Sequence, residues 1–372
     1  MKILLTGSNG FIGKNLTLWL KNHNHEVLGV DIDNADQLEN YLIECDYIVH
    51  LAGVNRPLNQ EEFYDGNTNL TKHLVDLLKK HHKDVPLIYS SSIQADLDNN
   101  YGKSKKLAED YLLSSGLRTY VFRLKNVFGK WCRPNYNSVV ATFCYNVAHD
   151  LPITIRDESY VVTFNYIDDI CRSWLNVIED KNNSGSKEIL YVEPSYECSL
   201  GDIAKLLYKF KNNRKSLLAP SSLNEFEKKL YATYLSYLDT KDFKYQLDMH
   251  VDNRGSFTEF IKTENEGQVS INIAKPGIVK GNHYHHTKNE KFLVVKGNCS
   301  IKFRKVDSDE IIEYIVSGDN LEVVDIPTGY THSITNIGTE DSVTVMWANE
   351  PFDKDNPDTY FLEVIQNAKK EN

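Results

Sequence analysis

Several features that mark common protein classes are missing from this chain of 372 residues. It has no apolar run of membrane length and no pair of cysteines at C-x-x-C spacing. Its six cysteines are scattered, which is typical of reduced thiols that pack in a core and not of a disulfide framework. The first apolar run breaks at Thr6-Gly7, too early for a secretory signal. We therefore expect a cytoplasmic protein that neither crosses nor enters a membrane.

An excess of positive charge is also missing. The chain has 42 Lys and Arg against 52 Asp and Glu, for a formal net charge of -10. Nucleic acids and anionic membranes attract proteins through clustered basic residues, so this balance argues against both as partners. A small anionic substrate needs only a local basic patch, and it stays possible on these grounds.

The pattern of strand-like and helical segments changes along the chain. Up to about residue 180, strand-like runs such as "KILLTG", "HEVLGVD", "CDYIVHLAG", "VPLIYSSS" and "TYVFRL" alternate with helical patterns. This alternation predicts a doubly wound parallel α/β sheet of the Rossmann type. From about residue 248, short strand runs follow one another without helices, which predicts an all-β barrel. We place the domains at 1–245, with substrate binding mainly in 125–245, and at 246–372.

A glycine motif directly follows the first predicted strand. Gly7, Gly10 and Gly13 have the spacing G-x-x-G-x-x-G and precede a helical pattern. Glycines there allow a tight turn and let a pyrophosphate reach the N–H groups of a helix N-terminus. Asp31 ends the second strand, where a carboxylate can accept hydrogen bonds from the adenosine ribose. The sequence thus predicts a nicotinamide dinucleotide site and favours NADH over the 2′-phosphorylated form.

A second local pattern points to proton transfer. Tyr101 and Lys105 are one helical turn apart, so both side chains can face one substrate. An adjacent ammonium would lower the pKa of the tyrosine and make it a better general acid. Ser90, Ser91 and Ser92 end the preceding strand and offer a hydroxyl to a carbonyl oxygen. The alternative for the Tyr-Lys pair is an ordinary solvated start of a helix.

In order and type, "TGSNGFIG", "DYIVHLAG", "SSS", "YGKSK", "RLKNVFG" and "FNYIDDI" resemble the extended short-chain dehydrogenase/reductases over roughly the first two thirds of the chain. The resemblance implies a catalytic set of Ser92, Tyr101 and Lys105. It implies nucleotide-sugar contacts from Asn126, Lys130 and Arg133. The cofactor-binding residues that it implies are Gly7, Gly10, Phe11, Ile12, Gly13, Asp31, Leu51, Ala52, Gly53, Asn67, Tyr101 and Lys105.

This resemblance has two departures. Ser92 and Tyr101 are nine positions apart, closer than in most members of the family. Ile93 and Gln94 stand where the sugar-nucleotide dehydratases of the family carry an acidic pair. Dehydration needs an acid and a base at adjacent carbons, so the second departure disfavours it.

A histidine-rich segment marks the second half. His283 and His285 are two apart and share a face on a strand, Glu290 follows, and His332 lies in "PTGYTHSITN". The patterns H-x-H-x4-E-x6-G and P-x-G-x2-H-x3-N resemble the two motifs of the cupin barrel. Three imidazoles and one carboxylate suit zinc, our first choice, but also Mn, Fe, Ni or Cu. His286 falls on the other face, and we expect it to be an exposed polar residue.

The segment "VDNRGSFTEF" resembles the start of the dTDP-4-dehydrorhamnose epimerases, which are themselves cupin-like. The resemblance implies that Arg254 and Glu259 contact the nucleotide sugar. It also places the catalytic histidine of those epimerases at His283, which the cupin motif uses as a metal ligand. One residue is poorly suited to both roles, so the residue that moves the proton stays open.

Taken together, the chain resembles the bifunctional capsular polysaccharide enzymes of the CapF/WbjC type over nearly its whole length. Such enzymes act on a UDP-linked 4-keto amino sugar on the route to UDP-N-acetyl-L-fucosamine. The resemblance implies C3 epimerisation in the cupin domain, then C4 reduction in the reductase domain. It favours NADPH, in conflict with Asp31, and cupins commonly form homodimers.

Two other functions stay open on the sequence. One is a UDP-sugar 4-epimerase that retains its NAD and carries a metal-binding cupin as an accessory. The other is an NAD(H)-sensing scaffold without turnover, which the complete Ser-Tyr-Lys set disfavours.

Overall fold

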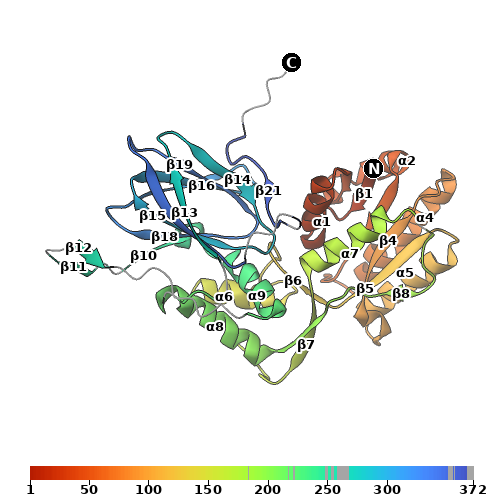
Figure 1. Ribbon diagram of the computed structural model, residues 1–372. Coiled ribbons are helices and arrows are strands. Elements are labelled where there is room, and N and C mark those ends of the chain that lie inside the picture. Colours follow the sequence, from red (N-terminus) through yellow and green to blue (C-terminus); the bar gives the residue numbers. More distant parts are fainter. Residues whose placement is uncertain are drawn as a thin grey trace, which may run out of the picture. The chain divides into compact units, whose positions relative to one another are not determined.

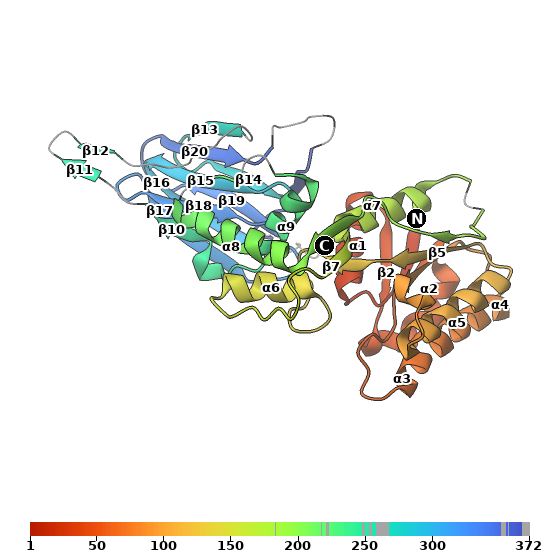
Figure 2. The ribbon, with the colours of Figure 1, turned by 90° about the horizontal axis from the view of Figure 1, so that it is seen from below.

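The structure is a computed structural model in which the chain forms two compact units (Figures 1 and 2). One unit contains residues 1–128, 132–139 and 161–198, and the other contains 129–131, 140–160 and 199–372. The described residues are 1–182, 184–216, 218–220, 223–247, 250–252, 255–257, 268–350, 355 and 357–366. The predicted domain boundary at 245/246 was placed where the sequence pattern changes to strands alone. The two units are instead defined by contacts between residues, so that boundary stays a prediction.

The first unit is built on a six-stranded sheet of order β2-β1-β3-β4-β5-β8, whose paired strands run parallel. This confirms the predicted Rossmann-type sheet. Its strands are β1 (Lys2–Thr6), β2 (Glu26–Val30), β3 (Tyr47–His50), β4 (Leu87–Ser92), β5 (Thr119–Leu124) and β8 (Ile189–Leu190). The main helices are α1 (Phe11–Asn22), α2 (Leu38–Glu44), α4 (Leu70–Lys80), α5 (Asn100–Ser114) and α7 (Ile167–Glu179). The short helical elements between them are η1 (Ile32–Gln37), α3 (Glu61–Phe63), η2 (Tyr64–Asn69) and η3 (Ile93–Asp96).

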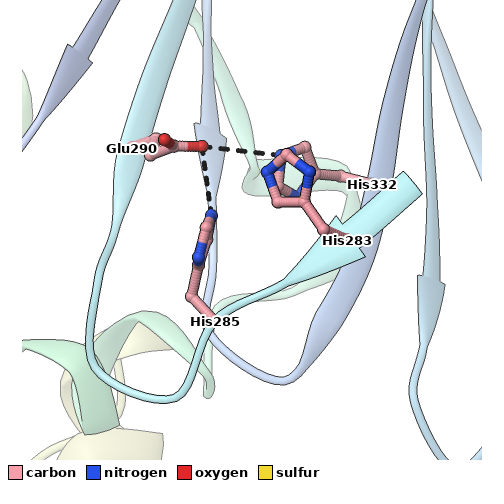
Figure 3. A group of neighbouring side chains, drawn as sticks. All are labelled: His283, His285, Glu290 and His332. Atoms are coloured by element: carbon pink, nitrogen blue, oxygen red, sulfur yellow. Dashed lines mark hydrogen bonds and ion pairs between the residues drawn. The ribbon is translucent and has the colours of Figure 1, made fainter. Parts of the chain in front are cut away.

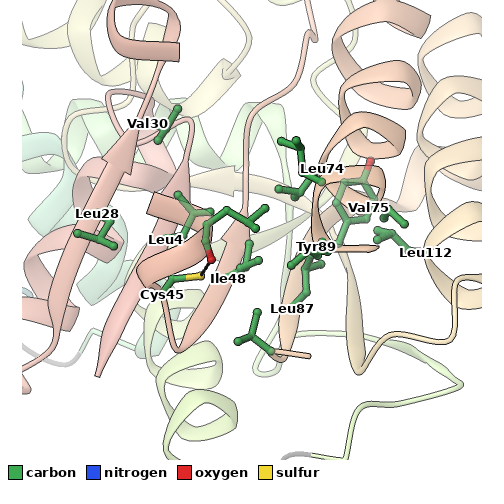
Figure 4. Packing of buried hydrophobic residues seen from close by; sticks show 14 of the residues in the cluster. Leu4, Leu28, Val30, Cys45, Ile48, Leu74, Val75, Leu87, Tyr89 and Leu112 are labelled. Carbon is green, nitrogen blue, oxygen red and sulfur yellow. Dashed lines mark hydrogen bonds between the residues drawn. The ribbon is translucent and has the colours of Figure 1, made fainter. Parts of the chain in front are cut away.

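The core of this unit lies between the sheet and its helices. Leu4, Ile48 and Leu87 come from neighbouring strands and pack with Leu74 and Leu112 of α4 and α5 (Figure 4). Strands β3 and β5 are buried along their whole length. Burial on both faces explains why apolar residues stand next to one another in these strands and do not alternate with polar ones.

The strand order sets where a ligand can bind. The chain leaves β1 toward β2 on one side and later continues with β3 on the other, so the direction reverses between β1 and β3. In open α/β sheets, ligands bind at the carboxyl ends of the strands at such a reversal. The glycine motif follows β1 and "LAG" follows β3, so both predicted cofactor loops lie at that point.

A small sheet and several helices complete the chain. Strands β6 (Asn126–Phe128), β7 (Val161–Tyr166) and β9 (Tyr196–Ser199) form a three-stranded sheet. The helices outside the first unit's core are α6 (Val139–Ala148), α8 (Leu200–Ser216) and α9 (Glu225–Leu235), with η4 (Thr240–Asp242) after them.

The second unit carries two five-stranded sheets whose paired strands run antiparallel, which confirms the predicted β domain. Their orders are β10-β18-β15-β20-β13 and β17-β16-β19-β14-β21. The rings of Phe292 on β15 and His332 on β19 lie 5.7 Å apart, so the sheets meet through their inner faces. The strands are β10 (Lys244–Gln246), β13 (Gln268–Ala274), β14 (Val279–Tyr284), β15 (Glu290–Lys296), β16 (Asn298–Lys305), β17 (Ile311–Ser317), β18 (Glu322–Ile326), β19 (Tyr330–Asn336), β20 (Ser342–Ala348) and β21 (Tyr360–Phe361), and β11 (His250–Asp252) pairs with β12 (Gly255–Phe257).

Among the residues that the structure describes, no helix has the length and apolar composition needed to span a bilayer.

None of the six cysteines forms a disulfide, and five of them are buried.

Candidate functional site

The glycine motif forms a close turn between β1 and α1. Gly7 has φ +71°, and its N–H donates to the carbonyl of Val30 at 2.7 Å. A Cβ on Gly13 would lie 2.3 Å from the Gly7 carbonyl oxygen, so only glycine allows this packing. Gly10 precedes α1 without a side-chain cap, which leaves the N–H groups of the first turn without a side-chain acceptor. This geometry fits a pyrophosphate at the helix N-terminus.

Asp31 directly follows β2 and lies beside this turn. One carboxylate oxygen accepts the N–H of Asn9 in the glycine turn at 2.9 Å, and the other accepts the N–H of Ile32 at 2.9 Å. The side chain of Asn34 accepts from the Asp31 N–H and closes a capping box. A negative charge therefore borders the region that a dinucleotide would occupy.

Tyr101 and Lys105 lie on α5, and Ser92 lies at the end of β4. Burial raises the pKa of Tyr101, and a hydrogen bond with Ser92 opposes that rise. Burial lowers the pKa of Lys105 to about 8, against the effect of Glu109. Lys105 Nζ donates to the Ser90 carbonyl at 3.0 Å and lies 4.9 Å from the centre of the Tyr89 ring. The pKa of Tyr101 is thus raised and not lowered as expected, because burial outweighs the hydrogen bond with Ser92.

Asn67 joins the loop after β3 to α5. Its amide nitrogen donates to the Val54 carbonyl at 2.9 Å and to Ser104 Oγ at 3.0 Å, and its oxygen accepts the Val54 N–H at 3.0 Å. A Cβ on Gly53 would lie 2.5 Å from Asn67 Oδ1 and 3.3 Å from Lys105 Nζ. Asn67 therefore fixes the loop beside Lys105, and both of its donors are already used.

The residues assigned to the nucleotide sugar have different environments. Asn126 is exposed and donates to the Thr163 carbonyl at 3.2 Å. Arg133 is exposed and stacks on the Tyr136 ring at 5.3 Å. Lys130 is only 1% exposed and lies 5.6 Å from the Trp131 ring centre. Arg254 and Glu259 lie outside the described residues.

The sequence reading missed a buried ionic cluster behind Ser92 and Lys105. Glu109 on α5 is fully buried and bonds Arg123 on β5 through two contacts of 2.8 and 2.9 Å. Ser91 Oγ donates to the same carboxylate at 2.5 Å, and Arg123 also pairs with Asp96 at 2.6 Å. An arginine inside the apolar run "TYVFRL" was the signal, since a buried charge needs a partner.

The second half brings together the four predicted metal ligands (Figure 3). One donor atom from each of His283, His285, Glu290 and His332 lies within 4.8 Å of the others. Glu290 begins β15, His332 is on β19 opposite His283 of β14, and His285 follows β14 directly. Glu290 Oε2 lies 3.3 Å from His285 Nε2 and 3.5 Å from His332 Nε2.

The electrostatics of this cluster suit a cation. Burial lowers the pKa of His283 to about 3, assisted by His332 and His285, so its imidazole is neutral. Burial also acts on Glu290, but the imidazoles of His285 and His332 hold its pKa well below the usual range. His332 is fully buried, and neither of its ring nitrogens has a hydrogen bond. Neutral imidazoles and an ionised carboxylate are the donor set of a divalent transition metal.

His286 corrects one expectation. It points away from the cluster as predicted, but it is 3% exposed and not a surface residue. Its ring packs against those of Tyr284 and Tyr360, with centroids 5.7 and 4.8 Å apart. The strand pattern correctly predicted which face of the strand His286 lies on. It could not predict the burial, because the residue that covers His286, Tyr360, lies far along the chain.

Both halves of the chain match known protein families. Residues 3–192 match the NAD dependent epimerase/dehydratase family, and residues 250–360 match the polysaccharide biosynthesis C-terminal domain. The chain is 45% identical to a UDP-2-acetamido-2,6-beta-L-arabino-hexul-4-ose reductase of Pseudomonas aeruginosa, over 99% of this chain and all of that protein.

Solved structures give the same picture. The capsular polysaccharide assembling protein CapF of Staphylococcus aureus is 52% identical, with a TM-score of 0.66 over 98% of this chain and all of that one. A UDP-glucuronic acid 4-epimerase of Bacillus cereus in complex with NAD is 23% identical, with a TM-score of 0.53 over 64% of this chain and 96% of that one. The latter likeness concerns the fold alone.

Proposed function

Because the chain belongs to the NAD dependent epimerase/dehydratase family and matches a UDP-hexulose reductase over its full length, we propose that it is a bifunctional UDP-sugar enzyme. It epimerises C3 of a UDP-linked 4-keto-6-deoxy amino sugar in the cupin domain. It then reduces the C4 ketone in the reductase domain, toward UDP-N-acetyl-L-fucosamine for a capsular or O-antigen polysaccharide. The observation that carries this proposal is the presence of two separate sets of reactive groups in one chain.

The residues Ser92, Tyr101 and Lys105 are suited to the reduction of a ketone by hydride transfer. A bound reduced nicotinamide supplies a hydride to C4. Ser92 hydrogen-bonds the carbonyl oxygen, and the Tyr101 hydroxyl gives that oxygen its proton as the negative charge develops. Lys105 stabilises the phenolate that remains, provided that its amine is charged. Gly7, Gly10 and Gly13 hold the pyrophosphate.

The candidate metal site of the cupin domain is suited to a reaction in which the proton on C3 is removed and then returned on the opposite face. This proton is alpha to the C4 ketone, so its removal gives an enolate whose negative charge must be stabilised. A bound divalent metal supplies positive charge there, or else it braces the barrel. His283, His285, Glu290 and His332 would hold it. Because His283 faces the cluster as a ligand, the base is another residue of the barrel.

The choice of reduced cofactor rests on Asp31. A carboxylate at the end of β2 accepts ribose hydroxyls and repels a 2′-phosphate, which supports NADH, whereas the CapF resemblance supports NADPH. We expect NADH to be at least competitive. Steady-state kinetics with both reductants test this expectation, and a strong preference for NADPH would contradict it.

Zinc is our choice of metal, because three imidazoles and one carboxylate are common zinc ligands. Elemental analysis of the purified protein identifies the ion. His285→Ala should abolish metal content, and a variant with full content would remove His285 from the site. Normal C3 exchange in that metal-free variant would exclude a role of the metal in enolate formation.

A homodimer is the expected assembly. Among the described residues, strand β13 lies at the edge of its sheet. Two apolar residues on this strand, Val269 and Ile273, are 51% and 58% exposed. An exposed apolar edge favours pairing with a second copy. Light scattering after size-exclusion chromatography measures the mass, and a monomer would contradict this expectation.

The direct test of the activity is incubation with the 4-keto UDP-sugar and reduced cofactor. We expect oxidation of one equivalent of cofactor and a product inverted at C3 and reduced at C4, read by NMR. A UDP-sugar 4-epimerase would interconvert C4 epimers without net oxidation of NADH. The solved 4-epimerases share only the fold with this chain, so the reductase is the favoured reading.

A further inference from the structure

A segment near the end of the chain runs along the metal-binding strand. Strand β21 pairs with β14 in a register that sets Phe361 opposite His283 and Tyr360 opposite Tyr284. The Leu362 N–H donates to the Asn282 carbonyl at 2.8 Å. The described residues 357–366 therefore form an outer strap on the strand that carries the first ligand.

Arg304 on β16 anchors this strap from the other side. Its guanidinium donates to the carbonyls of Glu363 and Val364 at 2.8 and 3.0 Å and is 4% exposed. The Thr331 hydroxyl on β19 also donates to the Leu362 carbonyl. Buried anchors at several points hold the strap in one position.

Asp358 of the strap binds the turn that joins His285 to Glu290. Its carboxylate accepts the N–H of His286 at 2.8 Å, of Thr287 at 2.6 Å and of Lys288 at 2.6 Å. The Thr287 hydroxyl donates to it at 3.0 Å. Hydrogen bonds to an ionised acceptor are short and strong, so this one carboxylate fixes the backbone between two ligands.

The strap also contacts the outer sides of the ligands themselves. The carbonyl of Asp358 accepts a hydrogen bond from His285 Nδ1. The other ring nitrogen, Nε2, faces Glu290 (Figure 3). Lys288 Nζ donates to Thr359 Oγ1 at 3.2 Å and lies 3.7 Å from Glu290 Oε1. The opposite oxygen, Oε2, is the one that faces His285 and His332.

We propose that Asp358, assisted by Thr359, is the positioning residue of the metal centre: its carboxylate fixes the path of the turn that joins His285 to Glu290. This inference rests on the proposed metal site. Groups that orient metal ligands from outside raise affinity without touching the ion, and their loss typically weakens binding by about 10 to 100-fold. The strap supplies that function from a part of the chain 73 residues away from His285.

The test uses the full-length protein with Asp358→Asn, which keeps the shape but loses a charged acceptor. The matched control is Glu363→Gln, an exposed carboxylate in the same strap. Zn(II) dissociation constants come from competition with a chelator below the unfolding midpoint, and Co(II) absorption spectra report the ligand geometry. We expect Asp358→Asn to bind Zn(II) about 10 to 100-fold more weakly with an altered Co(II) spectrum, and Glu363→Gln to match the wild type.

A purely structural role would lower the unfolding midpoint and leave both metal readouts unchanged, which would overturn the proposal. If Asp358→Asn does not fold, Thr287→Val decides the matter, since it removes only the hydroxyl that donates to the Asp358 carboxylate. A weaker Zn(II) affinity in that variant supports the proposal, and a wild-type affinity and spectrum overturn it. A wild-type protein that binds no metal would instead contradict the metal centre itself.

Discussion

At the scale of single residues, we propose that the charge on Lys105 controls the reductase half. Burial lowers its pKa to about 8, and the Glu109 carboxylate one helical turn away acts to raise it. A lysine is charged below its pKa, so we expect the reductase rate to fall as pH rises through about 8. Removing the negative charge with Glu109→Gln should move this fall to lower pH.

The measurement is kcat/KM for reduction between pH 6 and pH 10. Asp110→Asn is the control, because that carboxylate is on the same helix but pairs with Lys106 at the surface. An alkaline limb that stays in place in Glu109→Gln, or that moves equally in the control, would contradict this role of Lys105.

Tyr101 is the proposed proton donor. Phenylalanine keeps the ring, which packs 5.7 Å from that of Phe63, and removes only the hydroxyl. We expect Tyr101→Phe to lower kcat for reduction by about 10² to 10⁴-fold, the usual contribution of a general acid, with cofactor binding unchanged. Stopped-flow reduction and fluorescence titration of the cofactor separate the two, and unchanged turnover would refute the assignment.

At the scale of elements, a buried ion pair holds α5 against the sheet. Glu109 is fully buried and Arg123 is 6% exposed, and together with Ser91 they connect α5 to β4 and β5. Loss of Glu109 removes the buried partner of Arg123 and leaves it only the exposed Asp96. We therefore expect Glu109→Ala to cost about 3 kcal/mol of unfolding free energy.

The exposed pair on the same helix gives the comparison. Lys106 and Asp110 are 2.5 Å apart but 43% and 56% exposed in their side chains. Asp110→Ala should cost under about 0.5 kcal/mol, as for other surface pairs at this spacing. Urea unfolding of both variants measures the difference, and similar costs would contradict the argument.

The elements also show what the sequence could predict. Glycine spacing and strand period are local, so β1, α1 and the shared face of His283 and His285 could be predicted from the sequence. Glu290 and the distant His332 joined the candidate metal ligands only through the resemblance to the cupin motifs. The cover on His286 and the bonds of Asp358 depend on a strap some 70 residues away. No local pattern contains such a pairing. The Glu109–Arg123 pair was partly visible, because a charged residue interrupts an apolar strand.

At the scale of the whole molecule, metal binding should stabilise the barrel. A ligand that binds only the folded state adds about 4 kcal/mol at a concentration 1,000 times its dissociation constant. Chelation should therefore lower the unfolding midpoint of the wild type, and His283→Gln should remove this response. His286→Gln, which changes a histidine outside the cluster, should keep it. Differential scanning calorimetry with and without chelator measures the shift, and loss of the response in both variants would contradict the assignment of ligands.

The central claim is that one chain carries two successive steps in two separate sites. The most direct test follows C3 deuterium uptake from D₂O and oxidation of the reduced cofactor, with the 4-keto UDP-sugar as substrate, in Tyr101→Phe and His285→Ala. The account predicts that Tyr101→Phe exchanges C3 at the normal rate but oxidises cofactor about 10² to 10⁴-fold more slowly than the wild type. It predicts that His285→Ala loses exchange yet still reduces substrate supplied with C3 already inverted. Loss of both activities in Tyr101→Phe, with the cofactor still bound, would contradict the account.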